Sequence, residues 1–305
     1  MKMKNALTRL NRLGNRQSHW LMLAPYLFLF VVFILLPILL AIVLSFTNFN
    51  SVEFPDFKGI ENYLRAFTED TVFMQKILPN TILYAVIVGP GGYLLSFIMA
   101  WILSQLQRVP RTILAVVLYL PSLISGVAVS TIWAALFNGD RTGYLNDFLL
   151  QNGIINEPVQ WLQSADYLMP IMIMVALWSS MGIGFLSMLS GILNVDREQY
   201  EAGVIDGISN RVQEVIYITI PNIKSQMLFG AVMAVVNTFN TAGLGVALSG
   251  SNPTPGYAGS LIVNHIDDVG FIRYEMGYAA ALSVVLLLIV WLFNKLAYKL
   301  FGDSD

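Results

Sequence analysis

The chain has 305 residues, of which 56% are hydrophobic and only 12% carry a charged side chain, and its mean hydropathy is +0.65. A soluble domain has roughly a quarter charged residues, so this composition excludes an ordinary water-soluble protein. The net charge of −2 does not indicate nucleic-acid binding, and the absence of cysteine excludes disulfides and thiolate metal sites.

The charged residues are clustered, and six stretches between the clusters contain no Asp, Glu, Lys or Arg. Each stretch reaches or exceeds the roughly 18 apolar residues of a membrane-spanning helix. Because helices satisfy their own backbone hydrogen bonds in lipid, the sequence predicts an all-α membrane protein. The expected transmembrane domain covers residues 21–301, with spans near 21–47, 79–105, 112–137, 167–190, 223–248 and 277–299.

The first apolar run follows a basic stretch, as the core of a secretory signal peptide does. It is longer than the roughly 7–15 residues of a signal core, and no small-residue cleavage site follows it. We therefore expect a retained first helix.

Basic residues predict how the chain is oriented in the membrane. If the N-terminus is cytoplasmic, the inner segments are 1–20, 106–111, 191–224 and 295–305. These segments hold 12 of the 17 Lys and Arg, whereas the outer segments hold five basic and 12 acidic residues. The positive-inside rule then places both termini in the cytoplasm, with 1–20 as an N-terminal segment and 302–305 as a tail.

Helix-breaking residues occur inside the expected spans. The first span contains Pro25 and Pro37, the second is expected to be interrupted by Gly89-Pro90-Gly91-Gly92, and the third contains Pro121. Neighbouring helices can satisfy the carbonyls freed at such positions. Ordinary kinks and an irregular backbone that lines a transport path are both compatible with this pattern.

Two polar but uncharged clusters lie at membrane depth. They are "WSSMGIG" (178–184) and "NTFNTAG" (237–243). Interhelical hydrogen bonds would explain them. A binding site for an uncharged polyol would explain them equally well, because amides and hydroxyls beside aromatic rings suit such a ligand.

Enzyme chemistry has little support in the sequence. The two histidines, His19 and His265, fall on opposite sides of the predicted membrane, which excludes a two-histidine metal site. His265, beside Asp267 and Asp268, is expected in a solvated outer loop. No Gly-rich phosphate loop with its Lys is present, and no ionisable residue lies inside a predicted span. Uphill transport would therefore need another subunit as its energy source.

A charged segment separates the fourth and fifth predicted spans. Asp196 opens a capping-box pattern with Gln199, and the predicted helix then runs to Gly207, a residue that commonly ends helices. A second short helix leads to Pro221. The pattern predicts a cytoplasmic docking element in which the small pair Ala202-Gly203 lets a partner approach the backbone. An amphipathic loop on the lipid headgroups is the alternative.

This segment resembles the coupling motif of ABC importer permeases, which reads Glu-Ala-Ala, three residues, Gly, and later hydrophobic-x-hydrophobic-Pro. The matching residues are Glu201, Ala202, Asp206, Gly207, Ile218, Ile220 and Pro221. Nearly the whole chain is similar to sugar-transport permeases related to the larger maltose permease subunit, including "LPSLISGVAVSTIWAALFNGDRTGYLN" and "ALWSSMGIGFLSMLSGI". The motif departs from the family pattern at Gly203, which replaces the second Ala, and at Ile208, where Ala is common. The interval from Gly to Pro is also one residue longer than usual.

The resemblance implies a six-helix subunit of a type I ABC importer in the inner (cytoplasmic) membrane of a prokaryote. It implies a second homologous permease, two cytoplasmic ABC ATPases that bind ATP and Mg, and an extracytoplasmic solute-binding protein. The chain itself would be a transporter subunit, not an enzyme, and would bind no cofactor or metal.

The resemblance also assigns residues to two sites. The coupling loop is 194–221, with Glu201, Ala202, Gly203, Asp206, Gly207 and Pro221. For the substrate path it assigns Ser122, Ser179, Ser180, Thr238 and Thr241, to which Trp178, Asn237 and Asn240 of the two polar clusters are added. The expected substrate is an oligosaccharide or related glycan. Glycerol-phosphate or another small polyol, an ATPase-independent secondary transporter, and a scaffold without transport are the alternatives.

Overall fold

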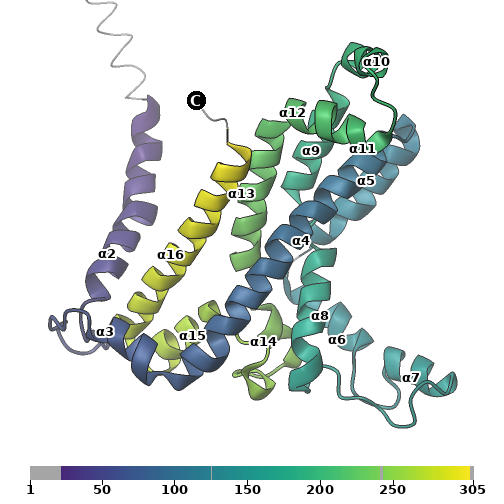
Figure 1. The fold of residues 1–305 in the computed structure, drawn as a ribbon. Coiled ribbons are helices and arrows are strands. Elements are labelled where there is room, and N and C mark those ends of the chain that lie inside the picture. The colour runs from purple at the N-terminus through teal and green to yellow at the C-terminus, as the bar shows by residue number, and fades with distance from the viewer. Residues whose placement is uncertain (1–21, 125, 241–242, 303–305) are drawn as a thin grey trace, which may run out of the picture. The chain divides into compact units, whose positions relative to one another are not determined.

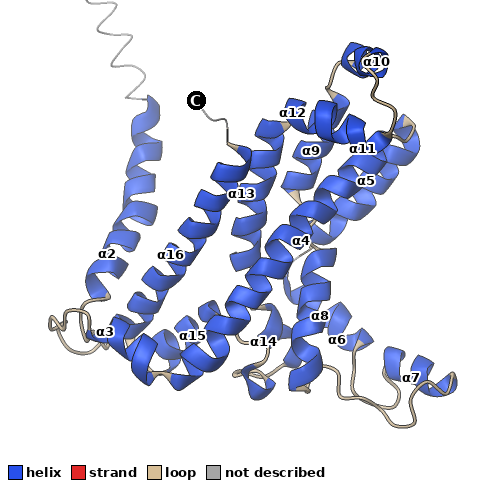
Figure 2. Cartoon of the chain, viewed as in Figure 1, coloured by secondary structure: helices blue, strands red, loops and turns tan. Residues whose placement is uncertain are grey.

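The structure is a computed structural model that describes residues 22–124, 126–240 and 243–302. Within these residues the regular secondary structure is helical (Figure 2), apart from one isolated antiparallel bridge between Thr47 and Phe57. This confirms the predicted all-α class. Contacts divide the chain into two units, one made of the described residues up to Leu64 with Val269–Val284, the other of Arg65–Asp268 with the residues from Val285 onward.

The first unit contains a long apolar helix, Met22–Leu44, which includes η1 (Val31–Leu35) and α2 (Leu36–Leu44). The chain that follows this helix is held by α3 (Glu61–Leu64). Asn62 Nδ2 donates to the carbonyl oxygens of Ser45 and Thr47, at 2.9 and 2.8 Å, and the Tyr63 hydroxyl donates to Ser45 Oγ at 2.7 Å. The two Asn62 bonds satisfy backbone carbonyls just beyond the end of the helix.

The second unit forms a helical bundle (Figure 1). Its elements are η2 (Arg65–Glu69), η3 (Phe73–Ile77), α4 (Leu78–Ser104), α5 (Arg108–Leu123), α6 (Gly126–Leu136), α7 (Tyr144–Gln151), α8 (Ala165–Trp178), α9 (Ile183–Leu193), α10 (Arg197–Ile205), α11 (Arg211–Glu214), η4 (Val215–Thr219), α12 (Ile220–Asn222), α13 (Lys224–Asn240), α14 (Leu244–Ser249), η5 (Pro255–Tyr257) and α15 (Ile262–Asp267). Two elements cross from one unit to the other, η6 (Asp268–Ile272) and α16 (Met276–Phe301).

Two buried clusters hold this bundle together. One joins α4, α9 and α13 around Phe185, Met188 and Ile223, toward the end that carries α10, α11 and α12 (Figure 1). The other surrounds Leu168 and Met172 of α8, toward the opposite end. Small residues let α9 and α13 approach closely, because a Cβ on Gly184 would lie 3.0 Å from the Gly230 Cα.

Proline explains the position of three π-helical segments. The segments η1, η3 and η4 each end two residues before a proline, at Pro37, Pro79 and Pro221. Proline has no N–H to donate, and its ring clashes with the carbonyl four residues earlier. The wider turn accommodates this clash, so the chain continues as a helix past each proline.

Three predicted spans are continuous helices and three are not. Among the described residues, Met22–Leu44, Phe73–Ser104 and Met276–Leu300 are each long and apolar enough to cross a membrane. The predicted span 112–137 is divided into α5 and α6, which are bent by 99°, and 167–190 into α8 and α9, bent by 41°. The predicted span 223–248 is divided into α13 and α14. Each of these three predicted stretches therefore consists of two helices rather than one.

Proline, glycine and serine explain where these helices stop. Pro121 lies in the last turn of α5, and Ile124 after it is extended. Ser179, Ser180 and Gly182 separate α8 from α9, and Gly243 precedes α14. Ser and Gly are poor helix formers. In contrast, α4 runs unbroken through Gly89-Pro90-Gly91-Gly92, so the predicted interruption there is wrong.

Candidate functional site

The three helix breaks line one cavity of about 500 Å³. Ser122, Ile124 and Gly126 flank the first break, Ser179 and Ser180 the second, and Gly243 and Leu244 the third. This volume is within the range of about 300–1,000 Å³ typical of small-molecule sites. Helix breaks that are distant in sequence therefore converge on one site.

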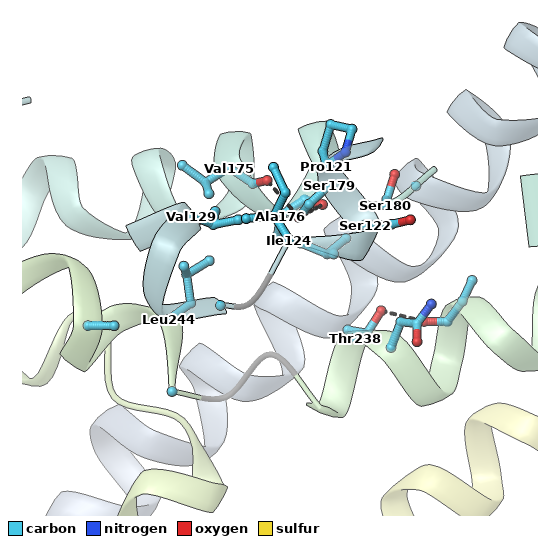
Figure 3. Close-up of a pocket in the computed structure, with 17 residues that line it drawn as sticks. Pro121, Ser122, Ile124, Val129, Val175, Ala176, Ser179, Ser180, Thr238 and Leu244 are labelled. Atoms are coloured by element: carbon cyan, nitrogen blue, oxygen red, sulfur yellow. Dashed lines mark hydrogen bonds between the residues drawn. The ribbon is translucent and has the colours of Figure 1, made fainter. Parts of the chain in front are cut away.

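Polar and apolar side chains both face this cavity. Its polar lining includes Ser122, Ser179, Ser180, Asn237 and Thr238, and its apolar lining includes Val88, Pro121, Ile124, Val129, Val175 and Leu244. Figure 3 shows the three serines grouped together, with Thr238 further away on α13. Asn237 also approaches the second break, because a Cβ on Gly182 would lie 3.8 Å from its Nδ2 and 3.7 Å from the Ser122 Cβ.

Each hydroxyl that lines the cavity donates its proton to its own backbone segment. Ser122 Oγ donates to the Tyr119 carbonyl at 2.7 Å, and Ser180 Oγ to the Leu177 carbonyl at 2.8 Å. Ser179 Oγ donates to the Val175 carbonyl at 3.0 Å, and Thr238 Oγ1 to the Ala234 carbonyl at 2.7 Å. A hydroxyl has one proton and two lone pairs. The three serines therefore offer the cavity acceptors rather than donors.

Five of the eight predicted path residues line this cavity, namely Ser122, Ser179, Ser180, Asn237 and Thr238. Trp178 does not. Its ring packs edge-on against Trp133, with the ring centroids 5.4 Å apart. Thr241 and the side chain of Asn240 lie outside the described residues.

The glycines of α4 bring other helices close to the cavity. A Cβ on Gly92 would lie 2.8 Å from the Ser180 Cβ, which is too close for any larger residue without movement. These glycines were predicted to break the helix, and their role in packing was not predicted. Their position in an otherwise continuous apolar run was the available signal.

His265 is not in a solvated loop, so that prediction is wrong. Its side chain is 6% exposed, and its Nε2 lies 3.0 Å from Asp70 Oδ2. The Phe73 ring stacks on the imidazole at a centroid distance of 6.0 Å. Asp70 also accepts from the Phe73 backbone N–H through Oδ1, at 2.8 Å. The pair thereby joins α15 to the segment before α4.

The predicted coupling loop, 194–221, forms a second candidate site at the far end of α9. It consists of α10, a turn at Gly207 with φ of +97°, and the helical segment from α11 to α12. Side chains with Cβ atoms rarely adopt such a φ. Asp196 lies at the N-cap of α10 without a side-chain capping bond, so the predicted capping box is wrong. Asn210 caps α11 instead, accepting from the Gln213 N–H.

Gly203 is buried inside this loop. A Cβ on Gly203 would lie 2.6 Å from Ile218 Cδ1 and 3.0 Å from Ile208 Cδ1. The suggestion that Gly203 opens the backbone to a partner is therefore wrong, whereas Ala202 is exposed. Two of the three departures from the family motif, Gly203 and Ile208, are linked, because a side chain at position 203 would collide with Ile208.

The outer surface of the loop is apolar to a degree unusual for a segment rich in charge. Val204, Ile205, Val212, Ile216 and Tyr217 are each at least half exposed. Glu201 pairs with Arg197 at 3.2 Å on the exposed surface of α10. Such an exposed pair contributes little stability. Apolar side chains gathered on one surface instead indicate an interaction site.

Metal chemistry has no support within the described residues, where no group of three or more His, Cys, Asp or Glu could hold an ion. Broken apolar helices around an uncharged polar cavity, with a structured loop at one end, are typical of a membrane permease. A family model for binding-protein-dependent transport system inner membrane components matches residues 92–301. The chain belongs to this family and is a permease of a binding-protein-dependent ABC importer.

Relatives named for the sugars they transport match over most of their length. The arabinooligosaccharides transport system permease protein AraP of Bacillus subtilis (strain 168) is 30% identical over 294 residues, which cover 95% of this chain and 90% of AraP. The lactose transport system permease protein LacF of Rhizobium radiobacter is 29% identical over 281 residues, covering 92% of each chain. Family membership confirms that the chain is a transporter subunit rather than an enzyme.

Two solved structures share the fold. A chain of a bacterial ABC transporter involved in the import of the acidic polysaccharide alginate superposes with a TM-score of 0.75 and 22% identity. That match covers 95% of this chain and 98% of the other. A bacterial alginate ABC transporter in complex with alginate pentasaccharide-bound periplasmic protein gives a TM-score of 0.77 at 20% identity, covering 97% and 98%.

Proposed function

We propose that this permease imports an oligosaccharide or related glycan by alternating access, driven by ATP. The observation that carries this proposal is the uncharged polar cavity at the three helix breaks, in a chain of the binding-protein-dependent family. A polyhydroxylated ring needs neutral donors and acceptors together with apolar surface, and this cavity presents both. AraP is named for the transport of arabinooligosaccharides and LacF for that of lactose, and both relatives support a carbohydrate substrate.

The proposed substrate path consists of the five lining residues Ser122, Ser179, Ser180, Asn237 and Thr238, extended by Asn240 and Thr241 of the same polar cluster. We assign Trp178 to packing against Trp133 instead. Because one net hydrogen bond contributes only about 0.5–1.5 kcal/mol, no single lining residue should be indispensable. Weak binding suits an importer that must release its solute.

The proposed membrane arrangement has six spans and two cytoplasmic termini. Each of the pairs α5–α6, α8–α9 and α13–α14 is then one broken span, beside the three continuous helices. The excess of basic residues in the inner segments supports this orientation. The membrane is the inner membrane of a prokaryote.

The proposed partners are a second homologous permease, two cytoplasmic ATPases that carry ATP and Mg, and an extracytoplasmic binding protein. The coupling loop 194–221 would dock on an ATPase, with Glu201, Ala202, Asp206, Gly207 and Pro221 at its surface and Gly203 supporting it from inside. The exposed apolar side chains of the loop support such docking.

Affinity purification of the tagged chain tests the importer. We expect an ATPase and a second permease to co-purify, and the ATPase activity in lipid nanodiscs to rise several-fold when the sugar-loaded binding protein is added. A stable homodimer without ATPase would contradict the proposal. So would an assembled complex whose ATPase activity responds to no loaded binding protein.

Cysteine labelling tests the orientation, and the chain has no native cysteine to interfere. An impermeant maleimide should label Asp147→Cys in intact cells, because Asp147 lies in a predicted outer segment. It should label Arg211→Cys only after the cells are opened. Both side chains are exposed in the structure, so the chain itself shields neither position from the maleimide. Labelling of Arg211→Cys in intact cells would invert the proposed topology.

A further inference from the structure

The hydrogen-bonding character of the cavity restricts the chemistry of its ligand. The hydroxyls of Ser122, Ser179 and Ser180 donate to backbone carbonyls, so each presents oxygen lone pairs to the cavity. Asn237 is exposed to the cavity, and its amide provides side-chain N–H donors there. The side chains therefore offer a ligand more acceptors than donors.

The backbone at the helix breaks adds no net charge to this site. Three helices end beside the cavity, at Leu123, Trp178 and Asn240, and each presents partly negative carbonyls. Three helices also begin there, at Gly126, Ile183 and Leu244, and these present partly positive N–H groups. The opposite ends occur in pairs, so the breaks do not bring helix N-termini together without C-termini beside them. None of the described residues that line the cavity is Asp, Glu, Lys, Arg or His.

We propose that this cavity selects neutral, hydroxyl-rich glycans and excludes acidic ones, such as uronates and sugar phosphates. The inference rests on the proposed sugar-import function and narrows its substrate class. Sugar hydroxyls donate to the serine oxygens, whereas a carboxylate or phosphate can only accept. An anion would have to divert several serine protons from the backbone and would still meet no cation among the described lining residues. An unpaired charge away from bulk water is costly. Glycerol-phosphate is therefore excluded as a substrate.

Matched ligands on the purified complex in nanodiscs, without the binding protein, test this inference. The probes are galactobiose, digalacturonate and the dimethyl ester of digalacturonate, together with cellobiose and cellobiouronate. Ligand-detected saturation-transfer NMR reports their weak binding. We expect at least one neutral sugar to bind at least tenfold more tightly than its acidic counterpart, a difference of about 1.4 kcal/mol. For the galacturonate series the neutral ester should restore binding, which separates charge from size.

Variants show whether the cavity itself makes this distinction. Asn237→Lys should bring the affinity for the uronates at least up to that for the neutral sugars, because it supplies the missing cation. Ser122→Ala with Ser179→Ala should weaken neutral binding several-fold. Ser104→Ala is the matched control, since Ser104 Oγ also donates to its own helix, at the Trp101 carbonyl, but lies outside the cavity.

Equal or tighter binding of uronates by the unmodified complex would overturn the inference, as would the absence of binding by every neutral probe. Neither outcome removes the importer function, which co-purification and stimulated ATPase activity establish independently. Failure of the complex to form or to couple would contradict the proposed function instead.

Discussion

The Gly203→Val variant should lose its association with the ATPases while still inserting into the membrane. Its first new atom would lie 2.6 Å from Ile218 Cδ1 and 3.0 Å from Ile208 Cδ1. Overpacking of a filled interior costs about 1–3 kcal/mol, and a β-branched residue adds further clashes. The contact between α10 and the helical segment after Gly207 would open, which changes the surface that we propose docks on the ATPase. Co-purified ATPase per inserted permease measures the loss.

A rescue experiment separates packing from other effects of Gly203. Gly203→Ala should reduce co-purification less severely, and adding Ile218→Val should restore it, because this change removes only the Cδ1 atom that the new methyl approaches most closely. The two changes should be strongly non-additive, as expected for residues in contact. Ile216→Val is the matched control, since Ile216 is half exposed and should not rescue. Equal rescue by both isoleucine variants would contradict the packing explanation.

Asp70→Ala should lower the thermal stability of the complex substantially. The change leaves the buried His265 side chain, which is 6% exposed, without the carboxylate that its Nε2 contacts, and leaving a buried polar group without its hydrogen-bond partner costs about 1–3 kcal/mol. Asp70→Ala also removes the carboxylate that accepts from the Phe73 backbone N–H, a bond that His265→Ala leaves intact. Asp70→Ala should therefore be the less stable of the two variants. Fluorescence-detected size-exclusion chromatography after heating measures the midpoint of aggregation in detergent.

The exposed Asp267, two residues from His265, is the matched control for this pair. Asp267→Ala removes the same carboxylate chemistry from the same region and should leave the midpoint nearly unchanged. The double variant Asp70→Ala with His265→Ala should be no less stable than Asp70→Ala alone. In the single variant the buried imidazole has lost its carboxylate partner, and in the double variant that imidazole is also absent. Equal midpoints for Asp70→Ala, Asp267→Ala and the unmodified protein would contradict a stabilising role for the pair.

The coupling loop shows how far local signals predict structure. The turn at Gly207 and the helices on both sides of it were predicted, because helix ends depend on residues within a few positions. The interior of the loop was not predicted. Gly203 contacts Ile218 only after the chain has turned at Gly207. The sequence therefore showed that Gly203 departs from the family motif but not that packing against Ile218 requires a glycine there.

The cavity likewise combines residues that were predicted from the sequence with residues that were not. Composition alone selected the clusters around Ser179 and Asn237, since neutral polar residues are conspicuous in apolar stretches. The apolar wall from Val88 and Val129 was not recognised, because these residues do not differ locally from others that face lipid. Of the three breaks, only the one after Pro121 was marked in advance by a helix-breaking residue, whereas the GPGG run in α4 marked a break that does not occur.

The sequence by itself determined the membrane class, the all-helical architecture and the family. The reason is that partition into lipid depends on local composition, and the coupling motif is recognised from the spacing of nearby residues. Only the tertiary structure decided which breaks meet in one cavity, where the serine protons point, and that His265 pairs with Asp70 from 195 residues away. The physical reason is that these features depend on contacts between distant segments, whose energies are realised only once the helices have packed.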